Sequence, residues 1–331
     1  MHCPAERVIE NGVNNNDKGR EKMSVTTLKR IALVTMVLGY IGSLIPGMPV
    51  FLQWLGKLSA PLFFYCMAWS LTKTSDKKAY FRRLYIASVA MAAFNLLMSV
   101  VAQKTGLVTA VTTNMFATLF ASAFLVDLIE YANRHPKRRL KIWFTYIFYQ
   151  VAVAGVWAGL YEIVEVPYAV LNFGSALLGS ALTCEGALMY VLIGVLFYFT
   201  KEDKSKKRMI LGYLGIFLVF FVNSAFGLWG RLFSLVGHDV LVALMEIMTG
   251  LVLWGASFRP IFDLSHMFHN DFQWMMIFAL PLVLGCNEKL GFCKKKRKRD
   301  KLSPQFRKYF YYIFYPVHVY VLWFIGAVIM K

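Results

Sequence analysis

Charged side chains are scarce in this sequence of 331 residues, of which 16% are Asp, Glu, Lys or Arg and 58% are hydrophobic. Soluble globular proteins contain about 25% charged residues. Four stretches have no charged residue at all: 84–103, 105–126, 142–161 and 209–230. Each has the roughly 20 residues that a helix needs to cross a bilayer core. These absences exclude a soluble enzyme, a secreted domain and a disordered chain, and they predict an all-α, polytopic transmembrane helical bundle.

Acidic residues are also few, since 18 Asp and Glu stand against 36 Lys and Arg and leave a net charge of +18. A nucleic-acid-binding protein would gather its basic residues on one folded face. Here 31 of the 36 lie between the hydrophobic stretches, at 1–30, 73–83, 134–141, 201–208 and 287–308. This pattern is typical of cytoplasmic loops. It predicts a multi-pass protein of the cell (plasma) membrane with a cytoplasmic N-terminus and no nucleic-acid partner.

Cysteines are few and form no recognisable framework. None of the five lies in a C-x-x-C pair, and the sequence therefore predicts neither a disulfide network nor a redox or metal site. The first 22 residues lack the apolar run of a cleaved signal peptide. We expect residues 1–27 to form a polar, disordered cytoplasmic tail and residues 28–331 to form a single transmembrane helical domain.

The hydrophobic stretches divide into about nine or ten helical spans. They are expected at 28–45, 51–72, 84–103, 106–130, 141–161, 167–200, 209–229, 232–258, 272–286 and 309–330. The stretch 167–200 is too long for one upright helix. Either a non-spanning piece precedes the span or the helix breaks near Gly179 and Ser180. The number of membrane crossings between 201–208 and 287–308 is open. Both segments are expected in the cytoplasm, which requires an even number of crossings, but three apolar pieces lie between them.

Ionisable side chains inside apolar helices are costly and mark candidate functional sites. Lys57 lies between two uncharged stretches, 31–56 and 58–72. Its ammonium either takes part in function or reaches the outer interface along its flexible stem. His318 lies about 15 Å into its helix if that helix starts near Lys308, which is the depth also expected of Tyr40, ten residues past Arg30. It is either a neutral histidine with a satisfied ring or a proton-transfer group, a role that its unperturbed pKa of about 6.5 suits.

Other polar groups in apolar surroundings each have two interpretations. Asp239 and Glu246 share a helix face and bind a cation or move protons, or they belong to a solvated cap. Glu185 marks either a helix break or a site. His266 and His269 have a spacing compatible with a metal or with a wet loop, and we predict no metal.

Several short motifs, in their order and spacing, resemble the TraX family, which is named after a conjugation protein that acetylates the N-terminus of pilin. The resemblance extends from about residue 26 to residue 330. Its segments are TTLKRIALVTM from Thr26, WLGKLSAPLF from Trp54, residues 72–84, NMF from Asn114, DFQW from Asp271, ALP from Ala279 and FYYIFYPVH from Phe310. The resemblance implies a membrane acyltransferase of about ten spans that moves an acetyl or acyl group from acyl-coenzyme A to an amine or hydroxyl acceptor.

The resemblance also implies partners and site residues. Acyl-coenzyme A is expected as a co-substrate, with no permanently bound cofactor, and membrane lipids are expected as further partners. The basic run 294–299 either fixes topology or attracts lipid headgroups or a polyphosphate-bearing ligand. The candidate catalytic residues are Tyr40, Lys57 and His318.

The first span departs from the family pattern, because Asp-His-Ile-Gly of the family reads Gly39-Tyr40-Ile41-Gly42 here. The family's second-span Arg is Lys57, which keeps the charge but loses bidentate geometry. A tyrosine, with a pKa of about 10, is a poor general base. We therefore expect impaired activity with His318 as a weak base, and we expect Gly39→Asp with Tyr40→His to raise acyl transfer.

Two rival functions belong to other classes. One is a non-catalytic relative that binds acyl-coenzyme A or a membrane partner, and the other is a small-molecule or lipid transporter. Proton-coupled transport would depend on Asp239, Glu246 or Glu185. Acyl transfer would depend on His318 and Lys57.

Overall fold

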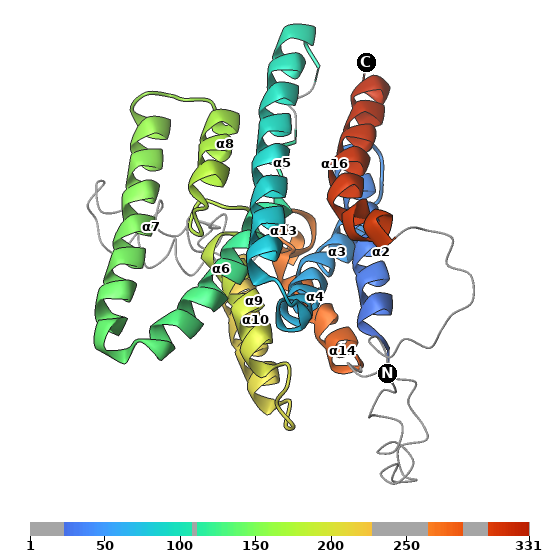
Figure 1. The fold of residues 1–331 in the computed structure, drawn as a ribbon. Helices are drawn as coiled ribbons and strands as arrows, with labels where there is room; N and C mark the ends of the chain where they lie inside the picture. The colour runs from blue at the N-terminus through green and yellow to red at the C-terminus, as the bar shows by residue number, and fades with distance from the viewer. Residues whose placement is uncertain (1–22, 108–110, 227–263, 287–303, 331) are drawn as a thin grey trace, which may run out of the picture.

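The computed structural model describes residues 23–107, 111–226, 264–286 and 304–330, and this part of the chain is a helical bundle without strands (Figure 1). Six of its helices are long and apolar enough to cross a membrane. They are α2 (Val25–Leu44), α5 (Lys77–Thr105), α6 (Met115–Arg134), α7 (Arg139–Glu162), α10 (Lys207–Phe226) and α16 (Pro304–Ile329). The predicted all-α, polytopic bundle is confirmed.

Within the described residues, several of the nine or ten expected helical segments consist of shorter helices. These are α3 (Phe51–Gly56), α4 (Ser59–Lys73), α8 (Tyr168–Leu178), α9 (Ala187–Thr200), α13 (Leu264–His269), the 3-10 helix η3 (Gln273–Phe278) and α14 (Ala279–Leu284). A further 3-10 turn, η2 (Pro136–Arg138), joins α6 to α7. The expected span 232–258 and the tail 1–22 lie outside the described residues.

Capping side chains and glycines determine where these helices begin and end. Ser24 Oγ accepts from Thr27 N (3.1 Å) at the start of α2, so the helical domain begins three residues before Leu28. Gly106 ends α5 in the left-handed conformation, and α6 begins only at Met115 instead of near 106. Gly179, with φ of 63°, ends α8. The expected break near Gly179 is therefore confirmed, and the long stretch 167–200 is two helices.

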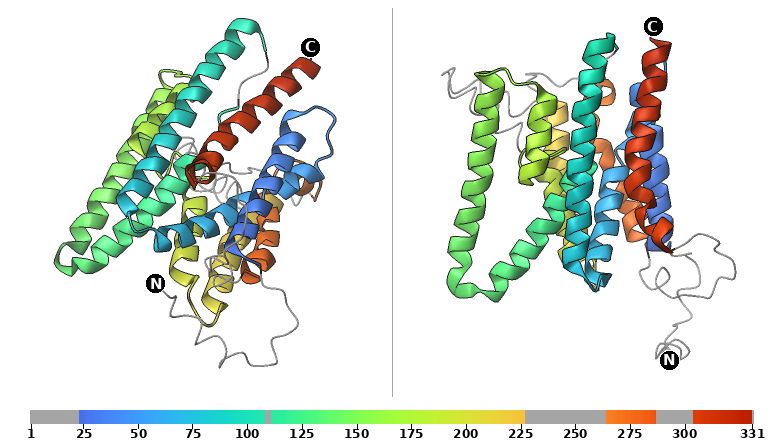
Figure 2. Two further views of the ribbon diagram at one scale, coloured as in Figure 1. Left: turned by 45° about the vertical axis from the view of Figure 1, so that its right-hand side comes forward. Right: turned by 45° about the horizontal axis from the view of Figure 1, so that its top comes forward.

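The basic connections within the described residues gather at one end of the bundle. The α6–α7 corner and the α9–α10 turn lie at this end, and the α7–α8 connection lies at the other (Figures 1 and 2). The chain leaves the basic end in α10 and returns to it in α14, where Met23 N donates to Gly285 O (3.0 Å). Residues 201–208 and the end of α14 therefore lie at the same end of the bundle, as an even number of crossings between them requires.

The core lies where α2, α4, α6, α9 and α10 meet. Its largest buried side chains include Tyr65, Phe197 and Tyr213, with the Phe197 ring stacked on Tyr213 at 5.6 Å. The helix α3 folds back on α2 after the Pro46–Pro49 turn. Gly39 of α2 and Gly56 of α3 face each other so closely that neither position has room for a Cβ atom.

Candidate functional site

Three interruptions between helices line one cavity of about 320 Å³ inside the bundle. They are the α3–α4 junction at Lys57, the α5–α6 connection at Thr113, and the α8–α9 connection at Glu185 and Gly186. Non-helical backbone at membrane depth is tolerated only where protein buries it or where it lines a cavity. The interruptions therefore identify this cavity as the candidate site.

Lys57 reaches the cavity because the chain cannot continue as one helix there. Pro61 has no N–H to donate to the carbonyl of residue 57, four positions earlier. The Lys57 side chain is half-buried, and Nζ lies 5.1 Å from the centroid of the Phe272 ring. The carboxylate of Glu185 lines the same cavity. The ammonium thus lines an interior cavity, which differs from the placement expected of a side chain that reaches the outer interface.

Glu185 fits both interpretations of its position in the sequence. It lies in the break between α8 and α9, and it lines the cavity. Its Oε2 accepts from Asn114 N (2.6 Å), and its backbone oxygen accepts from Thr118 Oγ1 (2.5 Å). The carboxylate therefore caps the N-terminus of α6, where the helix dipole favours negative charge. Of the described residues that line the cavity, Glu185 is the one carboxylate.

Tyr40 and Tyr315 present two phenol groups to the same cavity. Their hydroxyl oxygens lie 3.1 Å apart, and Tyr40 Oη donates to Thr113 Oγ1 (3.0 Å). Because the Tyr40 hydroxyl donates its one proton to Thr113 Oγ1, the Tyr315 hydroxyl is the donor in its hydrogen bond with Tyr40. Tyr315 Oη in turn accepts from Met115 N (3.3 Å). The result is a hydrogen-bonded chain that joins α2, α16 and the start of α6.

His318 is close to Tyr40 but does not line the cavity. The two rings are perpendicular with centroids 5.3 Å apart, as expected from their similar depth in α2 and α16. His318 Nδ1 donates to Phe314 O (2.8 Å), which leaves Nε2 as the unprotonated nitrogen of the neutral ring. Nε2 is buried without a hydrogen-bond partner among the described residues. His318 therefore packs against the Tyr40 ring on the side away from the cavity lining.

Asparagine side chains hold the α5–α6 connection in place. Asn95 Nδ2 donates to Thr113 O (3.0 Å), and Asn172 Nδ2 donates to Thr112 O. Asn114 Nδ2 donates to Ser88 O (2.9 Å). Sequence analysis missed these three residues, although an amide in an apolar helix signals a need for hydrogen bonds.

The structure corrects the expectation that an aspartate can be restored at position 39. A Cβ atom on Gly39 would lie 2.5 Å from Gly56 Cα, a separation that real structures do not show. An Asp side chain therefore does not fit while α3 packs on α2. The Gly39→Asp and Tyr40→His pair is expected to disturb the bundle before it supplies a base.

A narrower hollow of about 110 Å³ adjoins the cavity toward the basic end. Met36, Phe63, Met115 and Tyr315 line both spaces. Lys29, whose Nζ lies 4.0 Å from the centroid of the Tyr311 ring, lines the hollow on the side of the basic end. The cavity is therefore nearest to the basic end of the bundle on the side of this hollow.

None of the remaining candidates is among the described residues that line this cavity. Asp239, Glu246 and the run 294–299 lie outside the described residues. His269 Nδ1 bonds Ser265 O (3.0 Å) within its own helix. In the described ranges, no three His, Cys, Asp or Glu side chains are grouped as metal ligands would be.

Comparisons with known proteins find one family similarity, which covers the first part of the chain. The family model described as TraX protein matches residues 24–178. Searches of curated proteins and of solved structures find no match. The matched range includes Tyr40, Lys57 and the α5–α6 connection, and it ends before Glu185 and His318.

Proposed function

Because residues 24–178 belong to the TraX family, we propose that the chain is a multi-pass membrane acyltransferase that moves an acetyl or acyl group from acyl-coenzyme A to an amine or hydroxyl acceptor. The observation that carries the proposal is the interior cavity lined by one carboxylate, one ammonium and three phenols, those of Glu185, Lys57, Tyr40, Tyr190 and Tyr315. Acyl transfer needs a base for the acceptor and donors for the oxyanion.

Glu185 is proposed as the general base. The acceptor N–H or O–H gives its proton to the carboxylate while its nitrogen or oxygen attacks the thioester carbonyl carbon. When the tetrahedral intermediate collapses, the C–S bond breaks and coenzyme A leaves as a thiolate that takes up a proton. Asn114 N holds Oε2 (2.6 Å), whereas Oε1 makes no hydrogen bond to a described residue and is available for the acceptor. This assignment replaces the Asp-His pair that the first span lacks.

The three residues singled out from the sequence receive different roles. Lys57 and Tyr40, which line the cavity, are proposed as donors to the oxyanion that forms on the thioester carbonyl, Tyr40 by turning its O–H from Thr113 Oγ1 to the substrate. His318 contacts the Tyr40 ring and is proposed as a positioning residue. A phenol that donates a proton within a hydrogen-bonded chain suits a donor role better than that of a base.

The donor is proposed to approach from the basic end, which would face the cytoplasm under the positive-inside rule. The hollow beside Lys29 leads from that end toward the cavity. Arg and Lys side chains at the surface would bind the phosphate groups of coenzyme A, and the acyl thioester would extend inward. Coenzyme A is thus a co-substrate that enters and leaves, and no resident cofactor is required.

Acetyl-coenzyme A consumption by the full chain in reconstituted vesicles tests the proposal. We expect measurable turnover that Glu185→Gln lowers by about 10²–10⁴-fold, as for loss of a general base. Glu202→Gln makes the same chemical change at an exposed position in the α9–α10 turn and should leave turnover unchanged. Turnover that survives Glu185→Gln would overturn the assignment of the base.

His318→Ala separates positioning from catalysis. We expect it to lower turnover less than Glu185→Gln does, because the imidazole lies behind Tyr40. A His318→Ala variant as inactive as Glu185→Gln would return His318 to the role of base. Binding of acetyl-coenzyme A without turnover in the native chain would instead favour a non-catalytic relative.

A transporter is the second candidate, and the three helix interruptions around one polar cavity favour it specifically. Discontinuous helices that meet near the bilayer midplane form the substrate sites of many transporters. In that case Glu185 would bind and release a proton that crosses the membrane, and it would not take a proton from an acyl acceptor. Proton flux into vesicles that depends on Glu185, without acetyl-coenzyme A consumption, would decide for transport.

A further inference from the structure

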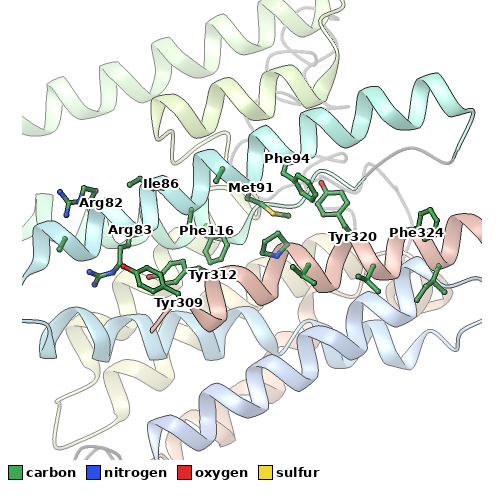
Figure 3. A pocket seen from close by; sticks show the side chains of 17 residues that line it. Arg82, Arg83, Ile86, Met91, Phe94, Phe116, Tyr309, Tyr312, Tyr320 and Phe324 are labelled. Carbon is green, nitrogen blue, oxygen red and sulfur yellow. The ribbon is translucent and has the colours of Figure 1, made fainter. Parts of the chain in front are cut away.

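A groove of about 1060 Å³ runs between α5 and α16 on the outside of the bundle (Figure 3). Its walls are apolar along most of their length and include Ile86, Met91 and Phe94 from α5 and Val321 and Phe324 from α16. Ile86 and Phe324 are 57% and 58% exposed, which is the exposure of side chains that face lipid. The groove is separate from the cavity that contains Glu185 and Lys57.

One end of the groove is cationic. Arg82 and Arg83 lie there together with Tyr309 and Tyr312, as Figure 3 shows, and this is the basic end of the bundle. Arg82 is exposed and Arg83 is half-buried. None of the described residues that line the groove is an Asp or a Glu. The site therefore has two guanidinium groups and no carboxylate of its own to neutralise them.

The groove is at least as long as the hydrocarbon half of one bilayer leaflet. Twelve residues of α5 separate Arg82 from Phe94, which corresponds to about 18 Å of helix. Half of a hydrocarbon core is about 15 Å thick. A ligand with a phosphate at the arginines could therefore place an extended hydrocarbon chain along the groove without leaving its leaflet.

We propose that this groove is a binding site for an anionic glycerophospholipid of the leaflet at the basic end. The phosphate would accept hydrogen bonds from Arg82 and Arg83, with the phenols of Tyr309 and Tyr312 beside it, and one acyl chain would lie between Met91 and Val321. Guanidinium groups bind phosphate oxygens in bidentate geometry, and basic pockets between membrane helices recognise lipid headgroups. A zwitterionic lipid would bring an ammonium toward the same two cations and would bind less tightly.

Native mass spectrometry of the full chain in detergent, titrated with phosphatidylglycerol or phosphatidylcholine, tests the site. We expect the native chain to bind phosphatidylglycerol about tenfold or more tightly than phosphatidylcholine, because each cation near the headgroup adds to the attraction. Arg82→Gln with Arg83→Gln should remove this preference. Lys78→Gln makes the same charge change at the same end, outside the groove, and should keep it.

Two further variants keep the test decisive if the double substitution does not fold. Arg82→Gln alone alters an exposed side chain and should lose part of the preference. Ala90→Trp fills the groove from α5 and should weaken both lipids. Equal binding of the two lipids by the native chain, an undiminished preference in Arg82→Gln, or competition by inorganic phosphate as strong as that by phosphatidylglycerol would each overturn the proposal.

Discussion

At the scale of single residues, two glycines determine how the site is built. A Cβ atom on Gly39 would lie 2.5 Å from Gly56 Cα, and one on Gly56 would lie 2.6 Å from Gly39 Cα. The missing side chains let α3 return along α2 and bring Lys57 to the cavity. In membranes, small residues at helix contacts allow backbones to approach in this way.

Gly39→Ala is therefore expected to lower thermal stability in detergent, at a cost of about 1–3 kcal/mol for an overpacked contact. It should also lower any activity that depends on Lys57. Gly215→Ala is the matched control, because a Cβ atom there meets nothing within 4 Å. A thermal unfolding scan compares the two, and equal stability of both variants would contradict the close contact.

Lys57 and Glu185 are expected to be energetically coupled, since opposite charges that line one cavity inside the bundle attract each other. Removing either charge leaves the other without compensation inside the bundle. Lys57→Met and Glu185→Gln should each lower stability, and the double variant should lose about 1 kcal/mol less than the sum of the two. Additive losses in a double-mutant cycle of thermal unfolding would show that the two charges do not interact.

At the scale of helices, Glu130 joins three of them at the basic end. Its Oε2 lies 3.0 Å from Lys77 Nζ of α5 and 3.0 Å from Arg134 Nη2 of its own helix α6. Tyr198 Oη of α9 donates to Glu130 Oε1 (2.6 Å). One carboxylate thus accepts charge-assisted hydrogen bonds from both neighbouring helices.

Glu130→Gln is expected to lower stability by about 1–2 kcal/mol, because hydrogen bonds to a charged group are lost. The loss should shrink in 1 M salt, at which the screening length is only about 3 Å. Glu202→Gln, at an exposed turn, should change stability little. A salt-independent loss in Glu130→Gln would indicate altered packing and not lost charge pairing.

At the scale of the whole molecule, the charge distribution predicts orientation. The basic connections of α6–α7 and α9–α10 lie at one end of the bundle and the α7–α8 connection lies at the other (Figure 2). We expect the basic end to face the cytoplasm, because positively charged loops are retained there.

Substituted-cysteine labelling in intact cells checks this orientation, with Cys3, Cys286 and Cys293 replaced by serine. Val164→Cys, at an exposed position of the α7–α8 connection, should react with an impermeant reagent from outside. Lys137→Cys, in the basic α6–α7 corner, should react only after the cells are opened. Labelling of Lys137→Cys from outside would reverse the orientation.

The amino-acid sequence was sufficient to predict a polytopic helical bundle and the positions of most of its helices. Uncharged stretches of about 20 residues carry this information locally, since each helix satisfies its own backbone hydrogen bonds in lipid. Gly179 as a breakpoint and the shared depth of Tyr40 and His318 were also readable, because both depend on local conformation and on helical rise. The family resemblance was likewise carried by local motifs.

Which polar groups contact one another became known from the three-dimensional arrangement of the helices. Glu185 lies in the second half of an apolar stretch, yet it contacts Asn114 N, 71 positions earlier in the chain. That contact requires the α5–α6 and α8–α9 connections to come together, which no helical period predicts. The clash at Gly39 likewise depends on α3 folding back onto α2. Local spacing fixes helices, whereas contacts between distant helix breaks arise from packing of the complete bundle.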